Sequence, residues 1–342
     1  MSVKTCDIHV HFGAPGEWDR DPYYWSEAFT RTGAYLAFRL ITGTVFTRLN
    51  FAKCRKKIVS VAGRAKKAGP CVLLALDKAY DEGGTARREW THLYVDNSVV
   101  IDMALAYPDL FRIGASVHPF NPRWREELET CIAAGAVLCK WIPSAQRIDP
   151  SDARFGPFYD ELAAHGLPLL CHAGPELSIP PLEPFLQCVN RPALLEDALC
   201  RGVPVIIAHA ALPFEKPFGH GTELDDYPPY LELLDLIRRA PAEGWRIYVD
   251  LSALLFARGR YLGRVLNDIP AKHLLLGSDY PIPISNLAPG RRLTPWTWIK
   301  RFVRTMTGGN LLDRNLFLLK EAGFNTAACR ENAEELFAAI RR

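Results

Sequence analysis

The sequence has no CxxC cysteine pair, no long apolar run and no basic tract, and each absence narrows what the protein can be. Its nine cysteines are scattered and odd in number, which argues against a disulfide framework and a cysteine-ligated zinc ribbon and favours a reducing, cytoplasmic setting. No apolar run reaches the length of a membrane span, and no secretion-signal segment opens the sequence, so we expect no membrane partner. The net charge is only +3, with dispersed lysines and arginines, so we also expect no nucleic-acid partner.

The 342 residues are 49% hydrophobic, which suffices for one large core, and we expect a single domain over 1–342. Short β-rich runs alternate with longer helical patterns, which is typical of βα units around a parallel sheet. The predicted strands are 5–12, 71–76, 111–117, 136–141, 168–172, 204–209, 246–251 and 273–277. The predicted helices are 60–68, 95–107, 124–134, 154–165, 192–201, 230–239 and 261–267. Eight such units predict an α/β fold, the (β/α)8 TIM barrel.

Two segments break the alternation of strands and helices. Residues 13–54 form a long, aromatic-rich insertion after the first strand, and residues 213–229 are rich in proline, glycine and acidic residues. A long connection at the catalytic end of a barrel usually becomes a lid or a pocket wall, although packing over the barrel mouth or an oligomer contact would explain 13–54 equally well.

The first predicted strand contains two histidines, His9 and His11, two residues apart. Side chains i and i+2 of a strand point to the same face, so we expect both imidazoles to converge while Ile8 and Val10 face the other way. An ordinary half-buried strand that binds no metal could also contain two such histidines. The pair therefore indicates a metal site only if other strands supply further ligands.

Nearly every predicted strand ends in an ionisable or metal-binding side chain, at the end where a barrel assembles its active site. In chain order these side chains are His9, His11, Asp77, His118, Lys140, His172, His209, Asp250 and Asp279. Burying such groups costs free energy unless they are paired or bind a metal. Imidazoles and a carboxylate suit a divalent ion such as zinc, and His9, His11, His172 and Asp279 would supply a ligand set with one position left for water.

A divalent ion lowers the pKa of its bound water from 15.7 toward about 7, so a hydroxide nucleophile becomes available at neutral pH. Asp279, held beside that water, could take its proton and later pass it to a leaving group. His209 could polarise the substrate oxygen or bind a second ion.

Five segments occur in order along the chain: DIHVH at 7–11, GLPLLCHAG at 166–174, PVIIAH at 204–209, LGSDYP at 276–281 and ENAEELF at 331–337. Together they resemble the amidohydrolase superfamily, and within it the amidohydrolase-2 branch that contains aminocarboxymuconate semialdehyde decarboxylase. The resemblance covers most of the chain. It implies that the residues matching His9, His11, His172 and Asp279 bind the catalytic metal, that Asp279 also shuttles the proton, and that His209 acts on the substrate or the water. It also makes a homodimer a reasonable expectation.

Lys140 stands where binuclear amidohydrolases carry a carboxylated lysine that bridges two metals. The six residues that match the ligands of such a site are His9, His11, Lys140, His172, His209 and Asp279. The decarboxylase-like branch is typically mononuclear, and there a lysine can instead orient a substrate carboxylate or form a structural ion pair. One or two ions are therefore both compatible with the sequence. Glu176, on the loop after the fifth strand, is a substrate-binding candidate or a solvated loop acid.

The leading hypothesis is a metal-dependent hydrolase that directs a metal-activated water at an ester, lactone or amide bond of a small molecule. The alternative within enzymes is non-oxidative decarboxylation of an unsaturated or aromatic carboxylic acid. A catalytically silent barrel that binds its metal structurally is the alternative from another class.

Overall fold

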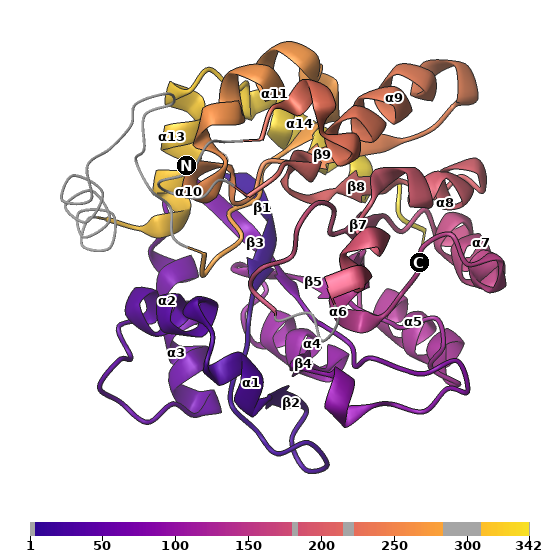
Figure 1. Cartoon of the computed structure of the whole chain (residues 1–342). Coiled ribbons are helices and arrows are strands. Elements are labelled where there is room, and N and C mark those ends of the chain that lie inside the picture. The colour runs from indigo at the N-terminus through magenta and orange to yellow at the C-terminus, as the bar shows by residue number, and fades with distance from the viewer. Residues whose placement is uncertain (1–3, 180–183, 215–221, 283–308, 342) are drawn as a thin grey trace.

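A computed structural model describes residues 4–179, 184–214, 222–282 and 309–341 of the chain. Eight parallel strands form its central sheet, in the order β1-β3-β5-β6-β7-β8-β9-β10, with helices around it (Figure 1). The strands are β1 Thr5–His11, β3 Ala68–Leu74, β5 Phe111–Ala115, β6 Ala136–Trp141, β7 Leu169–Cys171, β8 Val205–Ile207, β9 Ile247–Asp250 and β10 Leu274–Leu275. The predicted TIM barrel is confirmed.

Backbone hydrogen bonds between β1 and the segment that follows β10 close the sheet into a barrel. Ile8 N donates to Leu276 O at 2.9 Å, Asp279 N donates to His9 O at 2.8 Å, and His11 N donates to Tyr280 O at 2.8 Å. All three bonds involve residues beyond the end of β10, so the segment after that strand continues alongside β1. This closure brings residues 9–11 next to residue 279.

Apolar side chains fill the barrel and the space between the barrel and its helices, as the alternation along parallel strands requires. The interior cluster contains Val72, Leu138, Leu170 and Ile206, and Leu336 of α14 (Thr326–Ala338) packs against it. A larger cluster lies between the strands and the surrounding helices. The core therefore holds the strand ends rigidly around one point.

The helices around the sheet follow the predicted order, with changed ends. They are α3 Phe51–Arg64, α4 Asn97–Ala106, α5 Trp124–Ala133, α7 Gly156–His165, α8 Glu196–Cys200, α9 Pro228–Glu243, α11 Leu262–Asp268, α13 Leu311–Glu321 and α14. The predicted helix 60–68 is wrong in its extent. Asn50 caps the true start by accepting from Lys53 N at 3.0 Å, and Ala68 already belongs to β3, where it pairs with Thr5.

The insertion at 13–54 contains structure that the sequence did not predict. Strand β2 (Tyr23–Trp25) pairs antiparallel with β4 (Leu93–Val95), so Val95 is in a strand rather than in the predicted helix 95–107. Helices α1 (Glu27–Thr30) and α2 (Gly33–Thr42) follow, and together with α3 they form the indigo and purple lower left of Figure 1. Trp25 packs against Phe38 of α2, with ring centroids 5.2 Å apart. Across the described ranges, none of the helices has both the length and the apolar character needed to cross a bilayer.

Asp313 of α13 joins the C-terminal helices to the start of β3. Its carboxylate accepts hydrogen bonds from the backbone N–H groups of Lys66 and Lys67, both at 2.7 Å, and of Ala68 at 2.9 Å. Burial alone would raise the pKa of Asp313, but these three hydrogen bonds outweigh it, so the pKa is lowered.

We expect Asp313→Asn to lower the free energy of unfolding by about 1–3 kcal/mol, because an amide N–H would then face backbone donors. Urea denaturation measures the change, and Asp102→Asn, at an exposed carboxylate on α4, is the matched control. A carboxyl with a lowered folded pKa contributes stability above its unfolded pKa and loses it as pH falls through the folded pKa. The difference between the wild type and Asp313→Asn should therefore shrink at acidic pH, and equal stability at pH 7 would contradict this role.

Candidate active site

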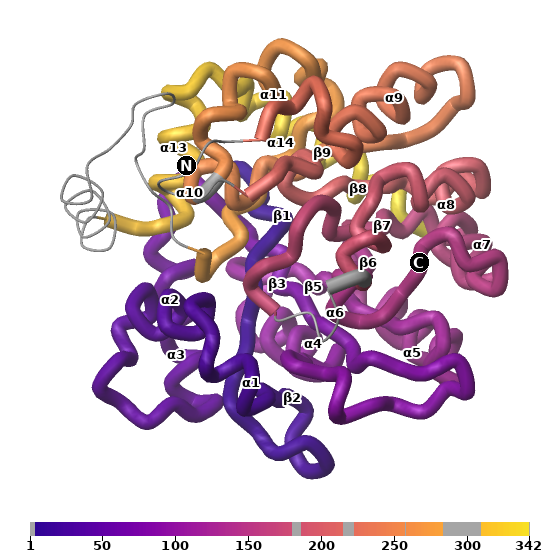
Figure 2. The backbone as a smooth tube through the Cα atoms, viewed as in Figure 1, coloured from indigo at the N-terminus to yellow at the C-terminus, as the bar shows by residue number. Residues whose placement is uncertain are grey.

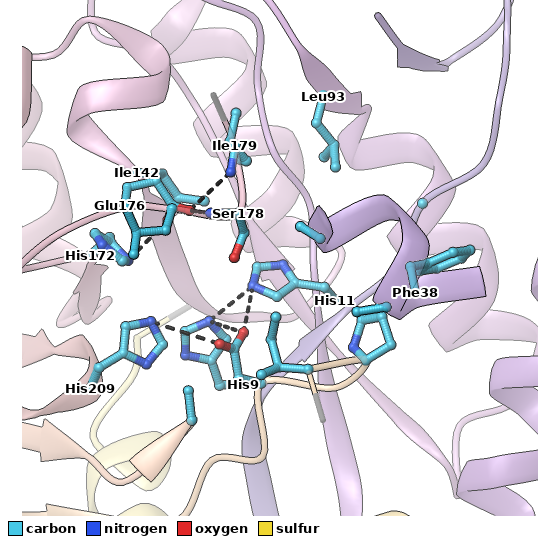
Figure 3. Close-up of a pocket in the computed structure, with 18 of the residues that line it drawn as sticks. His9, His11, Phe38, Leu93, Ile142, His172, Glu176, Ser178, Ile179 and His209 are labelled. Carbon is cyan, nitrogen blue, oxygen red and sulfur yellow. Dashed lines mark hydrogen bonds and ion pairs between the residues drawn. The ribbon is translucent and has the colours of Figure 1, made fainter. Parts of the chain in front are cut away.

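A cavity opens at the carboxyl ends of the strands, where the sequence predicted the site. Its floor contains the side chains of His9, His11, His172, His209 and Asp279. In Figure 3, His9, His11 and His209 face a common point, with His172 and Glu176 on one side and Phe38 on another. The structure thus brings four of the five strand-end histidines, together with Asp279, to one cavity, and His118 is not among them.

Three ligand atoms form the tightest group on this floor. His11 Nε2 lies 3.1 Å from His9 Nε2 and 3.1 Å from Asp279 Oδ1, and His9 Nε2 lies 3.5 Å from Asp279 Oδ1. Donors about 2.0–2.1 Å from a tetrahedral ion are about 3.3 Å apart, so these separations suit a zinc-sized cation. Two lone-pair nitrogens and a carboxylate oxygen at such distances repel one another unless a proton or a cation lies between them.

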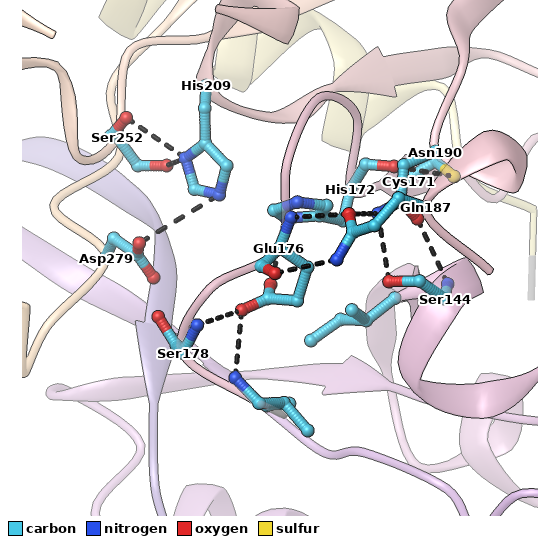
Figure 4. A network of polar contacts seen from close by, with 12 residues as sticks. Ser144, Cys171, His172, Glu176, Ser178, Gln187, Asn190, His209, Ser252 and Asp279 are labelled. Atoms are coloured by element: carbon cyan, nitrogen blue, oxygen red, sulfur yellow. Dashed lines mark hydrogen bonds and ion pairs between the residues drawn. The ribbon is translucent and has the colours of Figure 1, made fainter. Parts of the chain in front are cut away.

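The other nitrogens of two of these imidazoles are held by a polar network behind the cavity. His9 Nδ1 lies 2.6 Å from Asp250 Oδ2 and 3.1 Å from Ser252 Oγ. His209 Nδ1 lies 2.8 Å from Ser252 Oγ and 3.1 Å from Ser252 O (Figure 4). The hydroxyl of Ser252 donates its own proton to Asp250 Oδ2 at 2.5 Å.

This network determines which imidazole nitrogens carry protons. A carboxylate and a backbone carbonyl only accept, so His9 Nδ1 and His209 Nδ1 must donate. Their Nε2 atoms then have free lone pairs aimed into the cavity, the form in which a histidine binds a metal. The ligand atoms of His9, His209 and Asp250 are also close enough together to hold an ion, and in this structure hydrogen bonds join these residues.

Burial keeps these imidazoles neutral. Desolvation lowers the pKa of His9 and of His209 well below the ordinary value, and nearby positive charges add to the effect. Desolvation, with Lys140 as the next cause, lowers the pKa of His172 to about 3. The site is therefore a preformed set of neutral nitrogen donors at physiological pH.

His172 enters the cavity from the end of β7 but is not one of the three closest ligand atoms. Its ring centroid lies 5.0 Å from that of His209, and its buried Nε2 has no hydrogen-bond partner in the described chain. Its Nδ1 lies 3.4 Å from Glu176 Oε2, while Glu176 Oε1 accepts from Ser178 N at 2.6 Å (Figure 4). Glu176 is thus placed to orient His172, which the sequence analysis did not foresee. The contact between Glu176 and a substrate stays a prediction.

Two buried cations line the same cavity. Lys140 is 1% exposed, and its Nζ has no hydrogen-bond partner among the described residues. Arg258 is 5% exposed and donates from Nε to Leu212 O at 3.3 Å, with no carboxylate within 4 Å in the described ranges. Burial lowers the pKa of both groups, although the acidic side chains nearby oppose this. Two desolvated cations without carboxylate partners favour an anion in the cavity.

A register shift in β1 changes which side chains face inward. The pairing with β3 shifts between Asp7 and Val10, as at a β-bulge, so Ile8 joins the interior cluster instead of facing away from the histidines. Asp7 lies deeper and accepts from Ser278 N at 2.9 Å and His9 N at 3.3 Å. It therefore fixes backbone, while Asp250 is the carboxylate that contacts an imidazole.

Two other strand-end residues have structural partners instead of facing the cavity. Asp77 accepts from His118 N at 2.8 Å and Lys78 N at 2.7 Å, and His118 Nε2 lies 2.9 Å from Gln146 O. Neither side chain lines the cavity that holds His9, His11 and Asp279. The long loop 213–229 is described only in part. The sequence also predicts Arg291 and Arg292 in a loop at this end of the barrel, either binding an anionic substrate or solvated, and both lie outside the described residues.

The insertion after β1 supplies one wall of the cavity. Trp25, Phe29, Ala34, Ala37 and Phe38 line it from β2, α1 and α2. Aliphatic and aromatic residues of other segments continue the apolar surface, including Ile142, Ile179 and Phe256 of α10 (Leu254–Ala257). The cavity thus combines a polar floor with apolar walls, as small-molecule sites commonly do.

Two cavity residues have strained backbones. His209 and Asp279 have φ angles of 57° and 59°, in the left-handed region that costs a non-glycine residue roughly 1–2 kcal/mol. The hydrogen bond from Asp279 N to His9 O holds one of them in place. Such strain persists where the surrounding structure dictates the conformation, and it is frequent at functional sites.

A family model described as amidohydrolase matches residues 58–337. The chain therefore belongs to the amidohydrolase family, as its sequence motifs predicted. No curated protein matches the sequence.

Solved structures with the same fold span almost the whole chain. An uncharacterised TIM-barrel protein from Bordetella bronchiseptica has 15% identity and a TM-score of 0.55, covering 98% of this chain and 99% of that one. A 2,6-dihydroxybenzoate decarboxylase from Rhizobium has the same identity, TM-score and coverage. A candidate 2-pyrone-4,6-dicarboxylic acid hydrolase from Pseudomonas putida has 13% identity and a TM-score of 0.51, covering 100% of both chains. At such identities the likeness establishes the fold alone.

Gly277 allows the supporting network to approach the barrel wall. A Cβ atom there would overlap Asp250 Oδ1 and lie 2.9 Å from the Cβ atoms of both His9 and Ser252. We expect Gly277→Ala to displace Asp250 from His9 Nδ1 and to weaken zinc binding about 10–100-fold, the range typical for loss of the partner that orients a ligand. Zinc titration of the metal-free protein measures this.

Gly263→Ala is the matched control, because no atom lies within 4 Å of its Cβ position. Its zinc affinity should equal that of the wild type. Unchanged affinity in Gly277→Ala would show that the contact of Asp250 with His9 does not tune the site.

Proposed function

We propose that the protein is a metal-dependent hydrolase that uses water to cleave an ester, lactone or amide bond of a small molecule. The observation that carries this proposal is the position of Asp279. Its Oδ1 faces His9 and His11, while its Oδ2 lies 3.9 Å from His209 Nε2. One carboxylate oxygen can therefore bind a cation while the other accepts a proton.

The residues that would hold a divalent ion are His9, His11, His172 and Asp279. The fit rests on the three ligand atoms spaced 3.1–3.5 Å apart and on the buried His172 Nε2, which lacks a hydrogen-bond partner in the described chain. When bound, such an ion lowers the pKa of a coordinated water toward about 7.

The proton path follows from the imidazole and carboxylate geometry. Asp279 Oδ2 is the acceptor nearest the three-ligand group, and His209 Nε2 has a free lone pair because its Nδ1 donates to Ser252. Neutral His209 is thus suited to accept a proton or to bind a cation. The prediction that it polarises the substrate oxygen or binds a second ion stays a prediction. Asp279 would return its proton to the leaving group.

The buried cations Lys140 and Arg258 indicate that the substrate is negatively charged. Both are buried in the cavity wall without a carboxylate partner in the described ranges, and a substrate carboxylate would satisfy either one. The same observation favours a second candidate, non-oxidative decarboxylation, because these cations could orient the carboxylate that is lost. Fold neighbours that carry hydrolase and decarboxylase names are compatible with either reaction.

Metal content tests the ligand set and the role of Lys140. We expect elemental analysis to find one zinc-like ion per wild-type chain after purification with metal present, and the same value in Lys140→Ala. His11→Ala is the control and should lose the ion, because His11 Nε2 is central to the three-ligand group. Two ions in the wild type that fall to one or none in Lys140→Ala would establish a bridging lysine, and a wild-type value near zero would overturn the ligand set.

Substrate turnover tests the reaction. We expect hydrolysis in a screen of carboxylated lactones and esters tested beside hydroxylated aromatic acids. Asp279→Asn should lower kcat about 10²–10⁴-fold by removing the proton acceptor, with its metal content measured in parallel. Arg258→Met should raise KM more than it lowers kcat if it binds a substrate carboxylate. Release of CO2 without hydrolysis would favour the decarboxylase, and retained metal without any turnover would favour a silent barrel.

A further inference from the structure

The segment that contains α2 and α3 has a charge composition unlike that of the whole chain. Residues 28–76 hold ten lysines and arginines and no aspartate or glutamate. The ten are Arg31, Arg39, Arg48, Lys53, Arg55, Lys56, Lys57, Arg64, Lys66 and Lys67. The net charge of +3 for the full chain conceals this local excess.

Four large apolar side chains are exposed within the same segment. They are Leu36 (54%), Leu40 (39%), Val45 (37%) and Phe46 (100%). Leu36 and Leu40 are one helical turn apart on α2, and Val45 and Phe46 follow on the loop that leads to α3. We call these four residues the apolar ridge. The other large apolar side chains exposed in the described chain are single residues on different elements: Leu105, Leu177, Leu231 and Phe317.

The loop that carries Phe46 is held in place by Arg39. Its guanidinium donates to Thr44 O at 3.0 Å from Nε, and to Val45 O at 3.0 Å and Thr47 O at 2.7 Å from Nη2. A second nitrogen, Nη1, donates to Tyr35 OH at 2.7 Å. The exposed phenyl ring is thus presented to solvent by an organised loop, at a free-energy cost that binding to an apolar phase would recover.

Basic side chains border the apolar ridge without carboxylate partners. Arg48 and Lys53 are exposed and Lys57 is half-buried, and none of the three forms an ion pair within the described part of the chain. Lys53 Nζ donates to Arg48 O at 2.9 Å, and Lys57 Nζ lies beside Gly43 at the end of α2. Figure 2 shows α2 and α3 as neighbouring parts of the lower-left lobe.

A second copy of the chain and a nucleic acid each fit this surface poorly. In a two-fold dimer the same face would meet itself and bring like charges together. Single-stranded nucleic acid is bound by flat aromatic platforms, whereas Leu36, Leu40 and Val45 are aliphatic. An apolar wedge within a basic border is instead the pattern of a surface that inserts into the interface of an anionic bilayer.

We propose that the apolar ridge and the basic residues around it bind an anionic lipid surface. This departs from the expectation of no membrane partner, which rested on the absence of spans and on the overall charge. The opposite side of α2 lines the catalytic cavity through Ala34, Ala37 and Phe38. Binding would therefore set the wall of the cavity close to the lipid headgroups, whichever reaction the site performs.

Vesicle co-sedimentation tests the proposal with the full chain. We expect binding to phosphatidylcholine vesicles that contain phosphatidylglycerol, little binding to pure phosphatidylcholine, and release on raising the salt concentration. Phe46→Ser should lower the partition coefficient roughly tenfold, the effect of losing one buried aromatic side chain. Arg48→Gln, two residues from Phe46 on the same loop, should lower it about fivefold, as expected for one charge near such a surface.

Leu105→Ser on α4 is the matched control, since that leucine is 69% exposed and lies outside the ridge, and it should bind like the wild type. Equal binding of Phe46→Ser and the wild type, or no binding of the folded wild type to anionic vesicles, would overturn the proposal. So would binding of single-stranded DNA without binding of vesicles, or self-association that Phe46→Ser abolishes. Because the readout is lipid binding, its failure is distinct from failure of the proposed hydrolase activity.

Discussion

The closure of the barrel between β1 and the segment after β10 is the constraint on which the site depends. The backbone hydrogen bonds from Asp279 N to His9 O and from His11 N to Tyr280 O join the two ends of the sheet. They also bring the carboxylate of Asp279 within 3.1–3.5 Å of two imidazole nitrogens. The free energy of folding therefore holds three mutually repelling ligand atoms together, and a cation relieves that repulsion.

Hydrogen bonds behind the cavity determine which atoms of its histidines can bind a metal or accept a proton. Ser252 and Asp250 accept from the Nδ1 atoms of His9 and His209, so the lone pairs of both Nε2 atoms face the cavity. Glu176 likewise lies beside the Nδ1 atom of His172, at 3.4 Å. Three buried imidazoles are thus oriented by Asp250, Ser252 and Glu176, and burial keeps them neutral. The site needs little rearrangement to accept a metal, which is the advantage of preorganisation.

Much of this architecture could be predicted from the sequence, because parallel strands have recognisable apolar runs and their carboxyl ends meet at one edge. The barrel and the gathering of His9, His11 and Asp279 follow from that rule. The supporting contacts do not, because a serine such as Ser252 carries no sequence signal of its role and depends on a loop turning back toward β1. The register shift that turns Ile8 inward is equally invisible, since it arises from pairing with β3 and not from periodicity.

The region after β1 shows that the net charge of a whole chain can hide a strongly charged segment. Dispersed charges and a small net charge suggested an unremarkable surface, yet 49 consecutive positions lack any acidic residue, counting from 28 to 76. Helix α2 has one side against the cavity and another that exposes Leu36 and Leu40, so a single element contributes to two surfaces. A helix with two apolar sides does not have the single stripe expected of a simple barrel helix. The excess apolar surface therefore points to a contact outside the barrel, and the surrounding positive charge selects an anionic one.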